Sequence, residues 1–100
     1  MSQLIGKNVL IRADASGVHV GKLLERTLEG GLAYVLLENA MRIWEYEPLK
    51  GVSLSGVAVL GLKNPKNIGH TVPLHEIYGV CEMMAISDEA YLTAANAAGK

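Results

Sequence analysis

Alternation of apolar and polar side chains in the first quarter of the chain predicts two β-strands. Residues 7–13 (KNVLIRA) are rich in leucine and β-branched residues, and residues 17–26 (GVHVGKLLER) follow them after the turn sequence DASG. In the second strand the alternation places Val18 and Val20 on one face and His19 on the other. Because the connection is short, we expect the two strands to pair as an antiparallel hairpin.

The pattern continues into two further strands before the middle of the chain. Residues 32–38 (LAYVLLE) predict a third strand after the turn LEGG, and residues 41–46 (MRIWEY) predict a fourth after a bend at Asn39 and Ala40. A helix is the alternative for MRIWEY, but its β-branched and aromatic residues favour a strand. The first half of the chain therefore predicts an antiparallel meander.

The second half of the chain combines helix and strand signals. Residues 53–61 (SLSGVAVLG) carry apolar side chains at helical spacing and predict a short internal helix, with Ser53 as its N-cap. Residues 71–87 (TVPLHEIYGVCEMMAIS) are long enough for one extended strand, or for two strands separated by a kink near Gly79.

The last segment, DEAYLTAANAA, predicts a C-terminal helix. Ser87 followed by Asp88 and Glu89 is typical of a helix N-terminus, because the hydroxyl caps free amides and acids favour that end. The predicted fold class is therefore α+β: a small antiparallel β-meander with one short internal helix and a C-terminal helix. A chain of 100 residues fits one such domain, spanning residues 1–100.

Composition narrows the functional classes. The net charge is −1 and no block of lysine and arginine is present, so we expect no long nucleic acid as partner. The chain lacks both a signal-peptide pattern and an apolar run long enough to span a membrane, and it has one cysteine, Cys81. These features predict a soluble, intracellular protein, in which the apolar neighbours of Cys81 favour a buried thiol.

Catalytic and metal-binding motifs are absent from the sequence. No glycine-rich segment has the spacing of a phosphate loop, and no paired carboxylates or nucleophile elbow are recognisable. His19, His70 and His75 show no metal-ligand spacing with one another or with Cys81. The sequence therefore predicts a protein that is not an enzyme and that needs no cofactor or metal.

Arg42, Trp44 and Tyr46 share one face of the predicted fourth strand. A guanidinium beside two flat rings suits a nucleotide, since the rings stack on bases and the cation meets a phosphate. The alternative is that Trp44 anchors the core or a subunit interface, while Arg42 extends past it to solvent. On the residues alone, this alternative is favoured.

Several residues near the first hairpin are further candidates for ligand contacts. His19 lies between Gly17 and Gly21, two glycines that permit close approach of a ligand or of another chain. Turn and bulge geometry is the alternative explanation for these glycines. Arg12 and Arg26 end neighbouring predicted strands, where they are either solvated or in contact with phosphate.

Three segments together resemble a family of small phage-encoded proteins. They are IGKNVLIRADASGVHVGKLLER, VLLENAMRIW and SLSGVAVLGLKNP, which cover about two thirds of the chain in the same order. Within that family the chain is similar to the anti-CBASS sponges, which sequester cyclic-nucleotide immune signals without cleaving them. The chain departs from the pattern at Met41, where a basic residue is expected, and at Tyr46, where a tryptophan or similar aromatic is expected.

The resemblance implies a phage anti-defence protein in the cytoplasm of the infected bacterial host. It implies a homo-oligomer, dimer or tetramer, that holds a cyclic dinucleotide or related nucleotide between subunits. The aromatic rings would stack on bases, the arginines would meet phosphates, and His19 and Asn39 would read base or ribose edges. The alternative is a small phage structural or protein–protein interaction module that binds no small molecule. The ligand-binding residues predicted in this way are Arg12, Gly17, His19, Arg26, Asn39, Arg42, Trp44, Tyr46 and Ser53.

Overall fold

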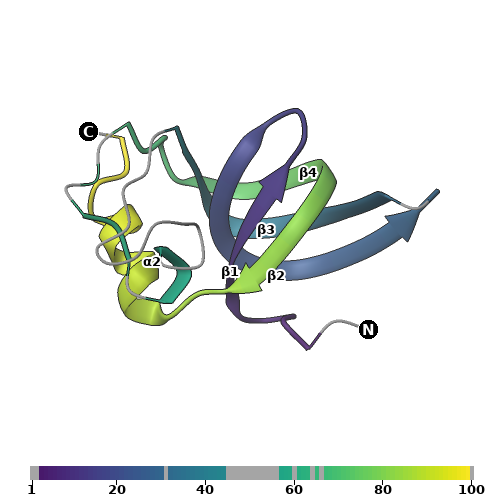
Figure 1. Ribbon diagram of the computed structural model, residues 1–100, viewed down its shortest axis with the longest axis horizontal. Helices are drawn as coiled ribbons and strands as arrows, with labels where there is room; N and C mark the ends of the chain where they lie inside the picture. Colours follow the sequence, from purple (N-terminus) through teal and green to yellow (C-terminus); the bar gives the residue numbers. More distant parts are fainter. Residues whose placement is uncertain are drawn as a thin grey trace.

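The computed structural model describes residues 3–30, 32–44, 57–59, 61–63, 65 and 67–99, and it contains a closed four-stranded antiparallel barrel. Its elements are β1 (Asn8–Ala13), β2 (Gly17–Glu29), β3 (Leu32–Ile43), β4 (Val72–Ala85) and α2 (Asp88–Ala95), with a short helical segment at residues 57–59. The helix lies beside the barrel, and the tip of the β2–β3 hairpin extends away from it (Figure 1). The predicted α+β fold, with a meander, a short internal helix and a C-terminal helix, is confirmed.

The barrel closes because β4 pairs with two different strands. Its first part pairs with β3 and its second part with β1, and the exchange takes place at Val80, which is opposite both Ala33 and Ala13. Extra residues at Gly79 and Cys81 flank Val80 and form bulges, with Gly79 at a φ of +71°. Of the two predicted alternatives, the structure has one long strand that bends at Gly79.

Strand β3 differs from the prediction, because the two expected strands are one strand that continues through Asn39. Asn39 has a φ of +51° and, with Ala40, forms a bulge opposite Gly21, so the residues opposite Lys22 and Val20 are Glu38 and Met41. A single left-handed residue shifts the ladder by one position without ending it. The bend was therefore predicted at the right place, but its consequence was not.

A second bulge lies at Leu24 in β2 and restores the original register. Leu23 is opposite Leu37 and Glu25 is opposite Leu36, so Leu24 is the extra residue. Beyond it, Arg26 is opposite Val35 and shares its inward-facing side of the sheet. The two bulges thus decide which residues of the β2–β3 hairpin face the barrel interior.

Strands β1, β2 and β3 each contribute to two separate layers of the core, and β4 contributes Ile77 to one of them. Strand β1 has Leu10 on one face and Val9, Ile11 and Ala13 on the other, and all four are buried. One layer fills the barrel and the other lies between the barrel and the helices. The barrel layer comprises Val9, Ile11, Ala13, Leu23, Val35, Leu37, Ala40 and Ile77. The outer layer comprises Leu10, Val18, Val20, Met41, Ile43, Val57, Ala58, Leu62, Ile68, Ile86, Ala90 and Ala94.

The predicted start of the last helix is confirmed, whereas the predicted environment of Cys81 is wrong. The Ser87 Oγ accepts a hydrogen bond from the Ala90 amide at 3.0 Å, and α2 then ends at Ala95. Cys81 is exposed because it is the extra residue of a bulge, and its Sγ donates to the Arg12 carbonyl at 3.3 Å. An apolar sequence neighbourhood did not bury this thiol.

We expect Gly21→Ala to lower the free energy of unfolding by about 1–3 kcal/mol, the usual cost of overpacking a well-filled site. A Cβ at Gly21 would lie 3.1 Å from both Cα and Cβ of Ala40 and 3.2 Å from the Glu38 carbonyl oxygen. Gly69→Ala is the matched control, since its Cβ would lie 3.5 Å from the nearest atom, the Arg42 carbonyl oxygen. Chemical denaturation gives the free energy of unfolding of both variants. Equal values for Gly21→Ala and Gly69→Ala would contradict the close contact between Gly21 and the Asn39–Ala40 bulge.

Candidate functional site

Polar and aromatic side chains gather at one end of the barrel, where the apolar filling stops. We call this set the barrel-end cluster: Ser16, Gly17, His19, Arg42, Trp44 and His75. His19 and Arg42 are opposite each other on β2 and β3, and the His19 and His75 rings meet edge to face with centroids 5.3 Å apart. Residues from three strands and one turn therefore form a single site.

His19 is the buried polar residue of this cluster. Its side chain is 1% exposed, and its Nε2 lies 3.1 Å from the Ser16 carbonyl oxygen and 3.0 Å from the Ser16 Oγ. A carbonyl oxygen can only accept, so Nε2 carries the proton and Nδ1 presents a lone pair. That Nδ1 atom is buried and has no hydrogen-bond partner in the described structure.

The surroundings of His19 keep its ring uncharged at neutral pH. Burial is the largest cause, followed by the nearby His75 and Arg42, and together they lower the pKa of His19 from 6.5 to about 4. The hydrogen bond to the Ser16 backbone acts in the opposite direction. His19 therefore supplies hydrogen-bonding groups to the cluster and no charge.

Arg42 and Trp44 form the exposed part of the cluster. The Arg42 guanidinium carbon lies 3.6 Å from the centroid of the Trp44 ring, which is cation–π geometry, and Trp44 is 62% exposed. The prediction that these two side chains share a face is confirmed by their contact. Trp44 is not a core residue, so the interpretation as a core anchor is wrong.

Gly17 allows the Arg42 side chain to lie against the start of β2. A Cβ at Gly17 would be 3.6 Å from Nη2 of Arg42, and the glycine has a φ of +82°. The backbone conformation thus requires glycine, while the space above it is already used by Arg42. Gly17, His19, Arg42 and Trp44 are the predicted site residues that the structure brings together.

The other predicted site residues lie elsewhere. Arg12 is on the outer face of β1, with its Nε 3.7 Å from Oε1 of Glu82. Arg26 lies seven positions further along β2 than His19, which is about 23 Å at 3.3 Å per residue. The Asn39 carbonyl accepts a hydrogen bond from the Tyr91 hydroxyl at 2.8 Å, which links β3 to α2.

Two predicted residues, Tyr46 and Ser53, lie outside the described residues. Two members of the cluster, Ser16 and His75, were not predicted as site residues. His75 is 56 positions from His19 in the chain, and only the pairing of β4 with β3 brings the two rings together. No local pattern signals such a contact.

A family model for a domain of unknown function, DUF6948, matches residues 6–93. The chain belongs to the DUF6948 family. No curated protein and no solved structure matched it. The DUF6948 description names no ligand or reaction, so the chemistry of this domain has to be inferred from its own residues.

The described part of the DUF6948 domain has neither a metal-binding group nor a membrane-spanning helix. Its residues include no group of three or more His, Cys, Asp or Glu side chains placed to hold a metal ion. Within the same described ranges, no helix is both long and apolar enough to cross a membrane.

We expect the stability of the domain to fall as the pH is lowered from about 6.5 to about 4. The pKa of His19 is lowered in the folded state, so between these values the unfolded chain binds more protons than the folded one. Between these two pH values the free energy of unfolding should fall by roughly 2–3 kcal/mol, since each pH unit contributes at most about 1.4 kcal/mol.

The measurement is urea denaturation over this pH range for the wild type, His19→Gln and His70→Gln. Glutamine keeps an N–H that can donate to Ser16 but does not titrate, so His19→Gln should flatten the pH dependence. His70 is exposed, and its replacement should leave the slope unchanged. Identical slopes for wild type and His19→Gln would contradict the buried, neutral imidazole.

Proposed function

We propose that the protein binds a small nucleotide, such as a cyclic dinucleotide, at the barrel-end cluster and holds it without cleaving it. The observation that carries the proposal is the Arg42 guanidinium stacked 3.6 Å from the centroid of the exposed Trp44 ring. The pair combines a flat apolar surface with a permanent positive charge at one point of the surface. Those are the two properties that a nucleotide needs from its binding site.

Trp44 suits the base of such a ligand. With the guanidinium over the ring and 62% of the side chain exposed, there is indole surface left for a base to stack on. Stacking of this kind contributes roughly 1–3 kcal/mol per base. Arg42 in turn offers a fork of N–H donors that matches the oxygens of a phosphate.

His19 supports binding of a base edge in preference to a second phosphate. Its ring is uncharged at neutral pH, and its Nδ1 lone pair has no partner in the described structure. Buried acceptors without a partner are uncommon and costly. Because Nδ1 is shielded from solvent, a ligand N–H or O–H group would reach it only after the side chains that cover the ring move aside.

The low pKa of His19 also favours retention of the ligand over its hydrolysis. A general base is most effective when its pKa lies near the working pH, and about 4 is well below neutrality. His19 is therefore a weak base at pH 7, although it is the residue most deeply placed in the cluster.

The biological setting that we propose rests on the sequence resemblance. It is sequestration of a cyclic-nucleotide immune signal in the cytoplasm of an infected bacterium, by a homodimer or homotetramer of a phage anti-defence protein. The chemical proposal, nucleotide binding at Arg42 and Trp44, can be tested independently of it.

A protein–protein interaction module is the second candidate. The observation that favours it is the pair of Tyr34 and Tyr78 on the outer face of β3 and β4, with ring centroids 5.2 Å apart and Tyr78 62% exposed. Exposed tyrosines are common in protein interfaces. In that case Trp44 would contact a protein partner, and no nucleotide would bind.

Thermal melting against a panel of cyclic and linear nucleotides distinguishes the two candidates. A ligand at a hundred times its dissociation constant stabilises the folded state by about 2.7 kcal/mol, which raises the Tm of a small domain by about 10 °C. We expect at least one nucleotide to produce such a shift with the wild type. Trp44→Ala should abolish the shift, and Arg42→Ala should weaken binding by about 1.5–3 kcal/mol.

Tyr78→Ala is the matched control, because Tyr78 and Trp44 are equally exposed but lie on different faces. It should leave nucleotide binding unchanged. A folded Trp44→Ala protein that binds every nucleotide as tightly as the wild type would refute the site. Linearised or monomeric products recovered from the complex by chromatography would refute retention without cleavage.

A further inference from the structure

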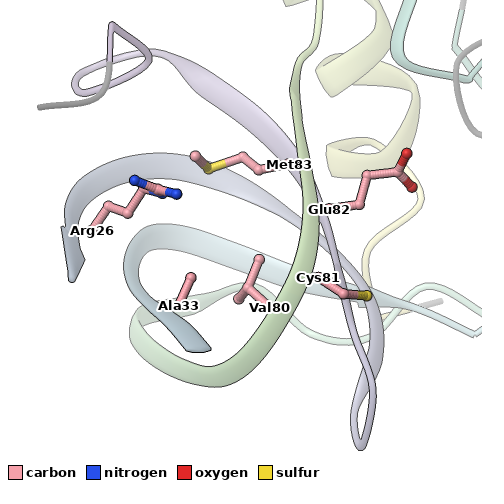
Figure 2. Close-up of a pocket in the computed structure, with 6 residues that line it drawn as sticks. All are labelled: Arg26, Ala33, Val80, Cys81, Glu82 and Met83. Carbon is pink, nitrogen blue, oxygen red and sulfur yellow. The ribbon is translucent and has the colours of Figure 1, made fainter. Parts of the chain in front are cut away.

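A hollow lies between the far part of the β2–β3 hairpin and the second half of β4, and none of the residues of the barrel-end cluster lines it. It has a volume of about 370 Å³, within the range of roughly 300–1,000 Å³ typical of small-molecule sites. Figure 2 shows the side chains that line it. They are Arg26, Ala33, Val80, Cys81, Glu82 and Met83.

The hollow exists because small side chains meet where the barrel closes. Val80 is opposite both Ala13 and Ala33, so this row across three strands is filled by two alanines and one valine. Val80 and Met83 pack against the barrel core and remain only partly buried. Val80 and Met83 therefore give the hollow a small apolar part, while more than half of its exposed lining is polar.

Arg26 gives this hollow a positive charge. The Leu24 bulge turns Arg26 to the inner side of the hairpin, opposite Val35, and its guanidinium lies near Met83 in Figure 2. Arg26 is exposed and has no ion-pair partner among the described residues.

Glu82 does not neutralise Arg26, although it is an acid that lines the hollow. In Figure 2 the Glu82 carboxylate lies on the opposite side of β4 from Arg26. Its Oε1 is 3.7 Å from the Nε of Arg12, on the outer face of the barrel. The cation inside the hollow is thus left for another anion.

We propose that this hollow binds a small ligand with one anionic head and a short apolar body. A carboxylate or phosphate head pairs with the Arg26 guanidinium, for which two parallel N–H···O bonds are the favoured geometry. The apolar body lies on the partly buried side chains of Val80 and Met83, from which it displaces water. This site is separate from the Arg42–Trp44 site, because Arg26 and His19 lie seven positions apart on β2.

The test is a titration with four probes, followed by amide and methyl chemical shifts in NMR spectra. Hexanoate and hexyl phosphate carry both parts of the ligand, hexanol carries only the apolar body, and acetate carries only the head. We expect hexanoate or hexyl phosphate to shift the signals of Ala33, Val80 and Met83. Hexanol and acetate should bind at least tenfold more weakly than these two probes. Whichever of hexanoate and hexyl phosphate binds more tightly identifies the head group.

Two variants test separately whether binding needs the positive charge of Arg26 and the open volume of the hollow. Arg26→Ala should weaken binding at least tenfold without loss of the fold, since the side chain is exposed. Ala33→Leu should fill the hollow and abolish binding while the charge remains. Lys22→Gln, on the outer face of the same strand, is the control that should leave binding unchanged.

Two results would overturn the proposal: no binding of any probe by the wild type, or equal affinity of Arg26→Ala and wild type for the anionic probes. Neither result bears on nucleotide binding, which is measured with different ligands and with variants of Trp44 and Arg42.

Discussion

One left-handed residue, Asn39, decides which side chains of β3 face the interior of the barrel. Successive residues of a strand point to opposite faces, so a ladder that slips by one position reverses every side chain beyond the slip. Without the bulge, the inward positions after Leu37 would be those of Met41 and Ile43, and Arg42 would point outward. With it, Met41 and Ile43 pack in the outer layer and Arg42 lies opposite His19.

The Leu24 bulge likewise decides which side chains of β2 face the interior. It affects the residues between Leu24 and the tip of the β2–β3 hairpin. Between the two bulges Leu23 and Leu37 face each other inside the barrel, and beyond each bulge an arginine takes an inward position. The barrel is therefore apolar in the middle, with Arg42 towards one end and Arg26 at the other. The middle of the barrel is filled by a packed apolar core, which leaves no room there for a ligand.

Much of the fold could be predicted from the sequence because its signals are local. Alternation identified the β1 and β2 strands, and the hydroxyl of Ser87 with two acids identified the start of α2. The continuity of β3 could not be predicted, since a turn and a bulge at Asn39 have the same local sequence. The exposure of Cys81 was missed for a similar reason, because a bulge in β4 depends on which strands β4 pairs with.

The candidate site was predicted only in part, because some of its contacts also depend on how distant strands pair. Arg42 and Trp44 are two positions apart on one strand, so alternation was enough to group them. His75 joins them only through the pairing of β4 with β3, whereas Arg26 is separated from His19 by seven positions along β2. Contacts that depend on long-range register leave no trace in a window of neighbouring residues.

The cross-strand pattern of nuclear Overhauser effects between β2 and β3 tests the Asn39 bulge most directly. We expect contacts from His19 to Arg42 and from Lys22 to Glu38, with the ladder shifted by one residue between them. Contacts from His19 to Arg42 and from Lys22 to Asn39 would mean an uninterrupted ladder. That result would contradict the bulge, and with it the inward position of Arg42 beside His19.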